Sequence, residues 1–125
     1  MSGYAGTLTA NIEATMQELK QRLFDYITKS SSVSFVELSR IEGFKGDFEM
    51  KGPEGYNVLL WTDMSEQACY AMLELLKEKK IEMLPTSFFV YLCDGCTLDI
   101  PLFKGRKTKA LRWQPVVFNV VKKRA

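Results

Sequence analysis

The sequence contains no histidine. Histidine is the commonest general base, the usual partner of a catalytic nucleophile and the commonest side-chain metal ligand. Carboxylates and lysines can support catalysis without it, but the lack of histidine favours a binding protein over an enzyme. We therefore expect no catalytic residues and no cofactor.

Long apolar runs are also missing. The longest, Pro115–Val121 (PVVFNVV), has the length of a strand, whereas a membrane helix needs about 20 apolar residues. The first ten residues, MSGYAGTLTA, do not combine a basic region with an apolar run, so we expect no signal peptide. The three cysteines are an odd number, which argues against a disulfide framework. These features predict a cytoplasmic protein that does not enter a membrane.

The composition is that of an ordinary globular chain. It has 125 residues, of which 46% are hydrophobic and 26% charged, enough for one domain with its own core. No linker rich in proline or serine divides it. We expect a single domain over residues 1–125, with flexible ends at 1–8 and 122–125.

Charge is distributed unevenly along the chain. The net charge is only +2, yet no acidic residue follows Phe103. Such a segment suits a phosphate backbone or another acidic surface. Alternatively, it packs against the acidic remainder of the protein or only keeps the chain end soluble, and the sequence leaves these readings open. The basic residues of the segment are Lys104, Arg106, Lys107, Lys109, Arg112, Lys122, Lys123 and Arg124.

Periodicity and capping signals predict three helices. Apolar residues recur every three or four positions over residues 9–29, which indicates an amphipathic helix. Ser34 and Glu37 form a capping-box pattern that predicts a short helix to about Ile41. A second capping signal at Asp63–Glu66 predicts a helix to about Lys79. Residues 44–62 look extended around a turn at 52–55, and 115–121 reads as a last strand.

The stretch LCDGCTL (92–98) allows more than one interpretation. Asp94-Gly95 between residues typical of strands predicts a β-hairpin with strands Phe88–Cys93 and Cys96–Phe103. A zinc site formed by Cys69, Cys93 and Cys96 is a less favoured alternative, because a closed structural site needs four ligands and no histidine can supply the fourth. The hairpin needs no further assumption, so we predict no metal site.

The order of these elements resembles the winged-helix superfamily, in which a β-hairpin wing follows three helices. The resemblance rests on SVSFVELSRI for the second helix, SEQACYAMLELLKEKKIEML for the third, and FFVYLCDGCTLDI for the hairpin. It implies an α+β fold of three helices, a C-terminal β-hairpin and one additional C-terminal strand. It also implies nucleic-acid binding as the commonest role. One departure is the segment between Ile41 and Asp63, which is longer than the turn of a helix-turn-helix.

The predicted third helix is poorly charged for DNA contact, because Glu66, Glu74 and Glu78 would face outward and repel phosphates. The basic segment after Phe103 is the better candidate. We predict nucleic-acid contact, with DNA favoured over RNA, through Lys104, Arg106, Lys107, Lys109 and Arg112, with Trp113 as a stacking surface. A core position is the other reading of Trp113. The alternative function is a protein-interaction module whose basic end docks on an acidic partner. A homodimer through the first helix and the last strand is a further expectation.

Overall fold

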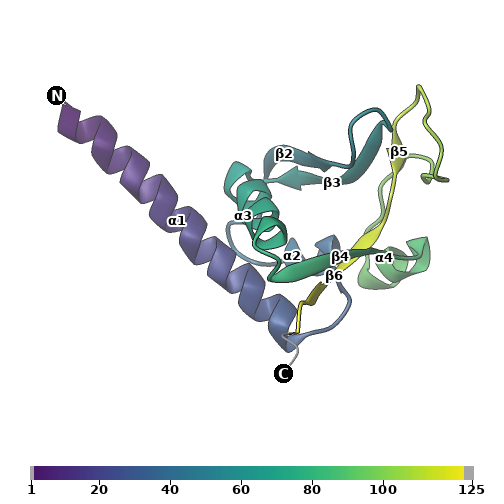
Figure 1. The fold of residues 1–125 in the computed structure, drawn as a ribbon, viewed down its shortest axis with the longest axis horizontal. Coiled ribbons are helices and arrows are strands. Elements are labelled where there is room, and N and C mark those ends of the chain that lie inside the picture. Colours follow the sequence, from purple (N-terminus) through teal and green to yellow (C-terminus); the bar gives the residue numbers. More distant parts are fainter. Residues whose placement is uncertain (1, 123–125) are drawn as a thin grey trace.

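The computed structural model describes residues 2–122, and side chains from residue 15 to residue 122. Figure 1 shows a long N-terminal helix beside a body of short helices and strands. The elements, in chain order, are α1 (Ser2–Lys29), β1 (Val33–Ser34), α2 (Phe35–Leu38), β2 (Lys45–Lys51), β3 (Val58–Met64), α3 (Glu66–Lys77), β4 (Ile81–Pro85), α4 (Phe88–Asp94), β5 (Arg112–Trp113) and β6 (Val116–Val120).

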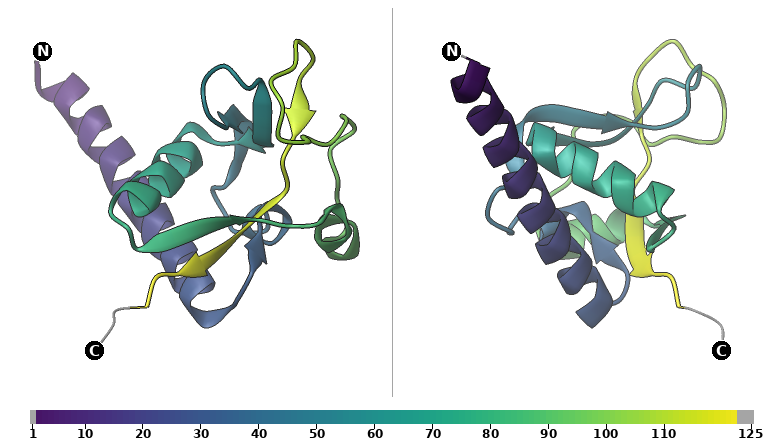
Figure 2. Two further views of the ribbon diagram at one scale, coloured as in Figure 1. Left: turned by 45° about the vertical axis from the view of Figure 1, so that its right-hand side comes forward. Right: turned by 60° about the vertical axis from the view of Figure 1, so that its left-hand side comes forward.

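The strands form two small sheets. One has the order β1-β6-β4 with all pairs antiparallel. The other has the order β2-β3-β5, in which β2 and β3 are antiparallel and β5 runs parallel to β3. Only Gln114 and Pro115 separate β5 from β6. One short segment of chain therefore passes directly from the second sheet to the first, as both views of Figure 2 show.

Aromatic side chains fill the space where these elements meet. Phe35 stacks on Trp61 with ring centroids 5.9 Å apart, and its edge contacts Phe118 at 5.0 Å. Tyr91 and Trp113 make a further edge contact at 5.1 Å. All five side chains are buried. Because large aromatic groups bury the most apolar area, this cluster is a principal source of stability.

Several local predictions are confirmed. The hydroxyl of Ser34 accepts a hydrogen bond from the Glu37 amide at 3.3 Å and caps α2. The Glu37 carboxylate does not accept from the Ser34 amide, as a complete capping box would require. It accepts instead from the Tyr26 hydroxyl at 2.7 Å. Residues 44–62 form β2 and most of β3 around the predicted turn, and the last strand is β6. Helix α3 is present, but its N-cap is Ser65 rather than Asp63.

The predicted hairpin at 88–103 is wrong. Phe88–Asp94 is helix α4, and residues 96–103 contain no strand, only an isolated bridge between Leu102 and Trp113. The Ser87 hydroxyl caps the start of α4 by accepting from the Phe89 amide at 3.1 Å. Gly95 ends the helix in the left-handed conformation, with φ of 104°. Glycine is favoured there because it carries no Cβ, so the signal assigned to a turn is a helix C-terminus.

The α+β class is confirmed, but the finer arrangement differs from the expectation. There are four helices among residues 2–122 rather than three, and no hairpin follows α3 directly. Helix α1 begins at Ser2, before the predicted start at residue 9. The flexibility of 1–8 and of Lys122 stays a prediction, and residues 123–125 lie outside the described part of the chain. Within that part, no helix has the length and apolar character needed to cross a membrane.

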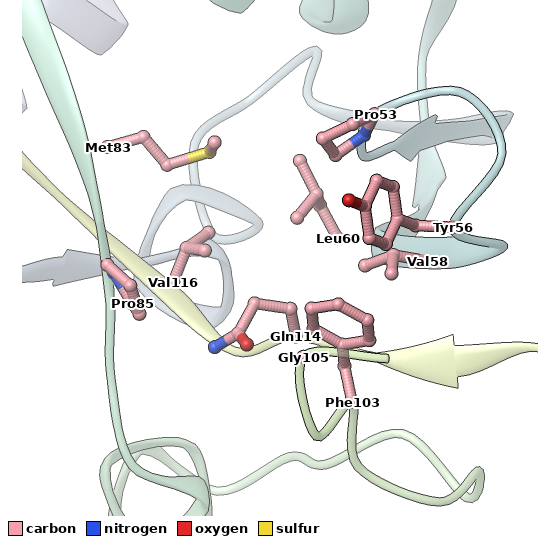
Figure 3. A pocket seen from close by; sticks show the side chains of 10 residues that line it. All are labelled: Pro53, Tyr56, Val58, Leu60, Met83, Pro85, Phe103, Gly105, Gln114 and Val116. Atoms are coloured by element: carbon pink, nitrogen blue, oxygen red, sulfur yellow. The ribbon is translucent and has the colours of Figure 1, made fainter. Parts of the chain in front are cut away.

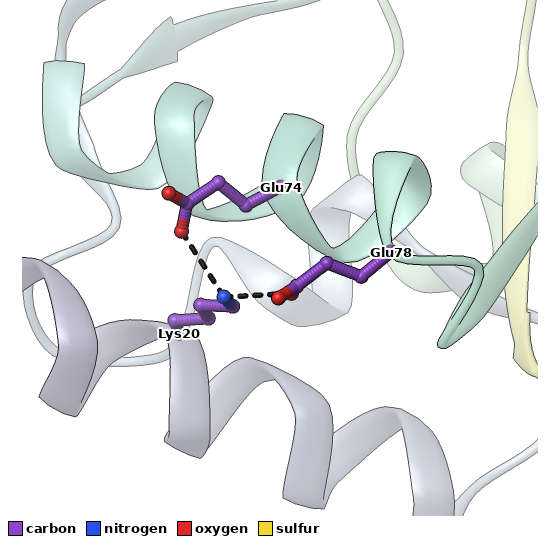
Figure 4. Close-up of polar contacts among 3 residues, drawn as sticks. All are labelled: Lys20, Glu74 and Glu78. Carbon is purple, nitrogen blue, oxygen red and sulfur yellow. Dashed lines mark hydrogen bonds and ion pairs between the residues drawn. The ribbon is translucent and has the colours of Figure 1, made fainter.

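Helix α1 is joined to α3 by a partly buried lysine side chain. The Lys20 Nζ contacts Glu74 Oε2 at 3.1 Å and Glu78 Oε1 at 2.7 Å (Figure 4). The side chain of Lys20 is only 12% exposed. Its hydrogen bond to Glu78 is the main reason why the pKa of Lys20 is raised and the pKa of Glu78 is lowered. The two shifts have the same origin, because each charged form stabilises the other.

This contact predicts an acid-sensitive contribution to stability. A carboxylate with a lowered pKa stabilises the fold above its ordinary pKa of 4.5, and that stabilisation is lost as the pH falls through the lowered value. Lys20→Met should therefore lower the free energy of unfolding at neutral pH and make it fall less steeply on acidification below the ordinary value. Urea unfolding across this pH range measures the effect. An unchanged acid slope would contradict the assignment.

Candidate functional site

The basic segment forms a loop whose base is fixed by backbone hydrogen bonds. We call residues 104–112 the basic loop. The Trp113 amide donates to the Pro101 carbonyl at 2.9 Å, and the Phe103 amide donates to the Trp113 carbonyl at 2.8 Å. These bonds bring the two ends of the loop together. Since Trp113 is fully buried, the loop projects from a rigid anchor.

The basic loop lies beside the turn that joins β2 to β3 (Figure 1). Asn57 holds the loop there through two hydrogen bonds. Its side-chain amide donates to the Lys109 backbone carbonyl at 2.7 Å, and its backbone carbonyl accepts from the Arg112 amide at 3.0 Å. The Lys107 ammonium lies 5.3 Å from the centre of the Tyr56 ring, within cation–π range. Two segments about fifty residues apart thus form one surface.

The cations of the basic loop form no ion pairs with the side chains that the structure describes. Lys104, Arg106, Lys107 and Lys109 are exposed, and Arg112 is half-buried. None of the five forms an ion pair with a side chain of residues 15–122, where the ion pairs involve other residues. The expectation that the basic segment packs against the acidic body therefore finds no support in this part of the chain. Exposed and uncompensated cations raise the local positive potential.

Three of the predicted residues surround one small hollow. Its volume is about 140 Å³, and its lining consists of Leu102, Lys104, Arg106, Thr108 and Arg112. The lining contains no carboxylate. The Thr108 hydroxyl already donates to the Ala110 carbonyl at 2.6 Å, so the guanidinium and ammonium groups are the donors that remain for phosphate oxygens. The hollow can therefore hold an anionic group without competition from an acidic side chain.

Of the two readings of Trp113, the structure supports the core position and not the stacking surface. Its side chain is fully buried, and its indole N–H donates to the Leu60 carbonyl at 3.3 Å. The aromatic groups beside the basic loop are instead Tyr56 and Phe103, both half-buried. Phe103 directly precedes the basic segment and could have been considered from the sequence. Tyr56 could not, because it reaches the loop only through the tertiary fold.

The three glutamates expected on the outer face of α3 do lie at the surface, but two of them also have a partner. Glu74 and Glu78 contact Lys20 of α1, and their side chains remain 42% and 43% exposed. Glu66 and Tyr70 remain exposed. Of the other basic residues near the C-terminus, Lys122 is exposed, whereas Lys123 and Arg124 fall beyond the described residues.

The cysteines are not gathered into a metal site. Cys69 is buried on α3, where burial raises the pKa of its thiol, while Cys93 and Cys96 are exposed near the end of α4. In the described chain, no group of three or more histidine, cysteine, aspartate or glutamate residues could hold a metal ion. The alternative zinc ligands Cys69, Cys93 and Cys96 therefore form no such group.

Comparison of the chain with protein-family models, with curated proteins and with solved structures finds no significant match.

Proposed function

We propose that the protein binds nucleic acid through the basic loop. The observation that carries this proposal is the group of five cations without ion-pair partners among the described side chains, three of which surround a small hollow. Nucleic-acid backbones bind such surfaces strongly because counterions are released. The absence of histidine and of a carboxylate in the hollow favours binding over acid–base catalysis.

A winged-helix-like arrangement in which β4 and β6, rather than residues 88–103, are the two wing strands would support the same proposal. Strands β4 and β6 follow α3 and pair in antiparallel fashion, as the two strands of a wing do. The connection between them, residues 86–115, includes α4 and the basic loop. In this proposal the basic loop occupies the position of the wing tip, and the β2–β3 hairpin is an insertion between the second and third helices. The likeness is one of architecture and carries no residue role by itself.

The same charges would also suit an acidic protein surface, which is the alternative function. The two differ in their partner and in the dependence of binding on salt, because each phosphate contact contributes about 0.7–0.9 to the logarithmic salt slope. The basic loop would serve either partner, so the choice between them rests on a direct titration. We regard nucleic acid as the better candidate because five cations within nine residues, with no carboxylate in the hollow among them, match the closely spaced charges of a phosphate backbone.

Neutralising the basic loop should abolish most of the binding. The variant replaces Lys104, Arg106, Lys107 and Lys109 by glutamine and keeps the half-buried Arg112. Fluorescence anisotropy with generic single-stranded and duplex DNA, at about 50 and about 200 mM salt, should show affinity reduced by about 100-fold at the lower salt. The salt slope should also become shallower by roughly three units, since four phosphate contacts are lost.

A matched control separates this effect from net charge alone. Replacing Lys29, Lys45, Lys77 and Lys79 by glutamine removes the same charge from exposed positions elsewhere. This control should retain most of the affinity. If both variants bind equally well, the basic loop is not the site. If the unmodified protein binds no DNA at low salt, the proposed function is wrong and the acidic partner becomes the better hypothesis.

A further inference from the structure

An apolar cavity opens beside the basic loop. Its volume is about 520 Å³, which lies within the range of about 300–1,000 Å³ typical of ligand pockets. It lies between β3 on one side and β4 with β6 on the other (Figure 3). The cavity is lined by Pro53, Tyr56, Val58, Leu60, Met83, Pro85, Phe103, Gly105, Gln114 and Val116. None of these side chains is charged.

Two aromatic rings form one wall of the cavity. Tyr56 and Phe103 meet edge to face, with ring centroids 6.1 Å apart and planes at 87°. Figure 3 shows the Tyr56 hydroxyl directed toward the interior of the cavity. Because the rings are perpendicular, a planar group that enters can stack on only one of them at a time. Both rings are half-buried, and aromatic rings that remain accessible are the groups on which proteins stack unpaired bases.

The polar groups of the cavity are few and well separated. Gln114 donates through Nε2 to the Pro115 carbonyl at 2.8 Å, and this bond fixes the side-chain amide. Its carbonyl oxygen and second N–H can still pair with a partner. An amide that both donates and accepts can bind the edge of a nucleobase. Together with the Tyr56 hydroxyl, it would orient such a group within an otherwise apolar space.

The cavity is continuous with the cationic surface. Gly105 belongs to the basic loop and also lines the cavity. The Lys107 ammonium lies over the Tyr56 ring at 5.3 Å, so a positive charge stands beside the aromatic wall. An occupant with a planar apolar part and an adjoining negative charge would match both regions. A nucleotide of a single strand has this combination, because its base is planar and its phosphate is anionic.

From this juxtaposition we infer that the cavity receives an unpaired nucleobase while the flanking phosphates contact the basic loop. The inference rests on the proposed function and refines it: the preferred ligand is single-stranded nucleic acid rather than duplex. In a duplex the bases are stacked and paired, so that a base reaches the cavity only after it is extruded, at a cost in free energy. A strand without bases offers the phosphates alone.

Three probes with equal numbers of phosphates per strand test the inference. They are an oligothymidine of about twelve nucleotides, an abasic strand of the same length, and a duplex of that length. Anisotropy titration at low salt should show the oligothymidine binding about tenfold more tightly than the abasic strand, and more tightly than the duplex. Equal binding of the oligothymidine and the abasic strand would overturn the inference but leave the proposed function intact. Binding of none of the three would overturn both.

A pair of variants locates the effect. Tyr56→Ala removes one aromatic wall and should weaken oligothymidine binding by about tenfold while leaving the abasic strand less affected. Tyr70→Ala is the matched control, because Tyr70 is an exposed tyrosine on α3, outside the cavity lining. Circular dichroism establishes that both variants are folded. Equal losses for the two probes in Tyr56→Ala would overturn the inference, since the residue would then act on the phosphates or the loop alone.

An amphipathic small molecule is the competing occupant. Dodecanoate, which has an apolar chain and an anionic head, serves as the probe. If it binds in a manner that Tyr56→Ala abolishes, and oligothymidine does not displace it, the cavity belongs to such a ligand and the inference is wrong. Displacement of dodecanoate by oligothymidine, but not by the abasic strand, supports the base-binding role.

Discussion

Replacing Trp113 with alanine should lower the free energy of unfolding by about 3–5 kcal/mol, the cost typical of removing a large buried aromatic side chain. Trp113 is fully buried and contacts Trp61, Tyr91 and Phe88. Its removal leaves a cavity at the junction of the two sheets. It also leaves the Leu60 carbonyl without the indole N–H that now donates to it.

Urea and thermal unfolding measure this loss directly. A domain of this size should lose more than about 10 °C in melting temperature. Trp113→Phe is the matched control, because phenylalanine retains an aromatic ring and much of the buried area. It should cost clearly less than the alanine variant. A stable Trp113→Ala protein that loses only DNA binding would contradict the buried position and revive the stacking role, which was the other reading of this residue.

Replacing Tyr91 with phenylalanine should cost at least about 2 kcal/mol, although only one oxygen atom is removed. The Tyr91 hydroxyl donates to the Val116 carbonyl at 2.6 Å and accepts from the Phe35 amide at 3.1 Å. Burial raises the pKa of this hydroxyl, which keeps it protonated and able to donate. Both backbone partners become unsatisfied in the variant, and each buried unsatisfied group costs about 1–3 kcal/mol.

Neither partner has an obvious substitute. Phe35 is the first residue of α2, and its amide has no acceptor within the helix. Val116 lies opposite Pro85 in the β4–β6 pair, and proline has no N–H to donate. Tyr70→Phe provides the control, because Tyr70 is half exposed to solvent and should be nearly neutral. Chemical denaturation compares the two. A cost for Tyr91→Phe no larger than that for Tyr70→Phe would contradict the role of this bridge.

Residues 88–94 form helix α4 although their sequence also suits a β-hairpin. The residues Phe88, Phe89 and Val90 favour strands, and Asp94-Gly95 suits a tight turn as well as a helix end. The two interpretations differ in what happens to Tyr91. In a helix between Ser87 and Gly95, Tyr91 enters the core and bridges α2 to β6. That contact involves residues about 25 and 56 positions away, so no local pattern contained it.

The candidate site was found in part from the sequence. The absence of acidic residues after Phe103 identified the basic loop, and its cations are exposed or half-buried as a binding surface requires. The choice of Trp113 as its aromatic partner was wrong, since adjacency in sequence does not determine which side chains share a surface. Tyr56 lies beside the basic loop because its neighbour Asn57 binds the loop through both its side chain and its backbone.

By itself, the sequence determined the α+β class, the C-terminal end of α1, the position of α3, the β2–β3 hairpin, the last strand and the uneven charge. These features depend on periodicity, capping residues and composition, which act over a few neighbouring positions. Only the tertiary structure decided how the two sheets share the segment 112–120, why α4 is a helix, and which residues line the cavity. Gly46 is one example: a Cβ there would lie 2.6 Å from the Ser65 Cα, a constraint set by a segment nearly twenty residues away. Such decisions depend on long-range packing, because the free energy of burying a side chain is set by whatever the fold places against it.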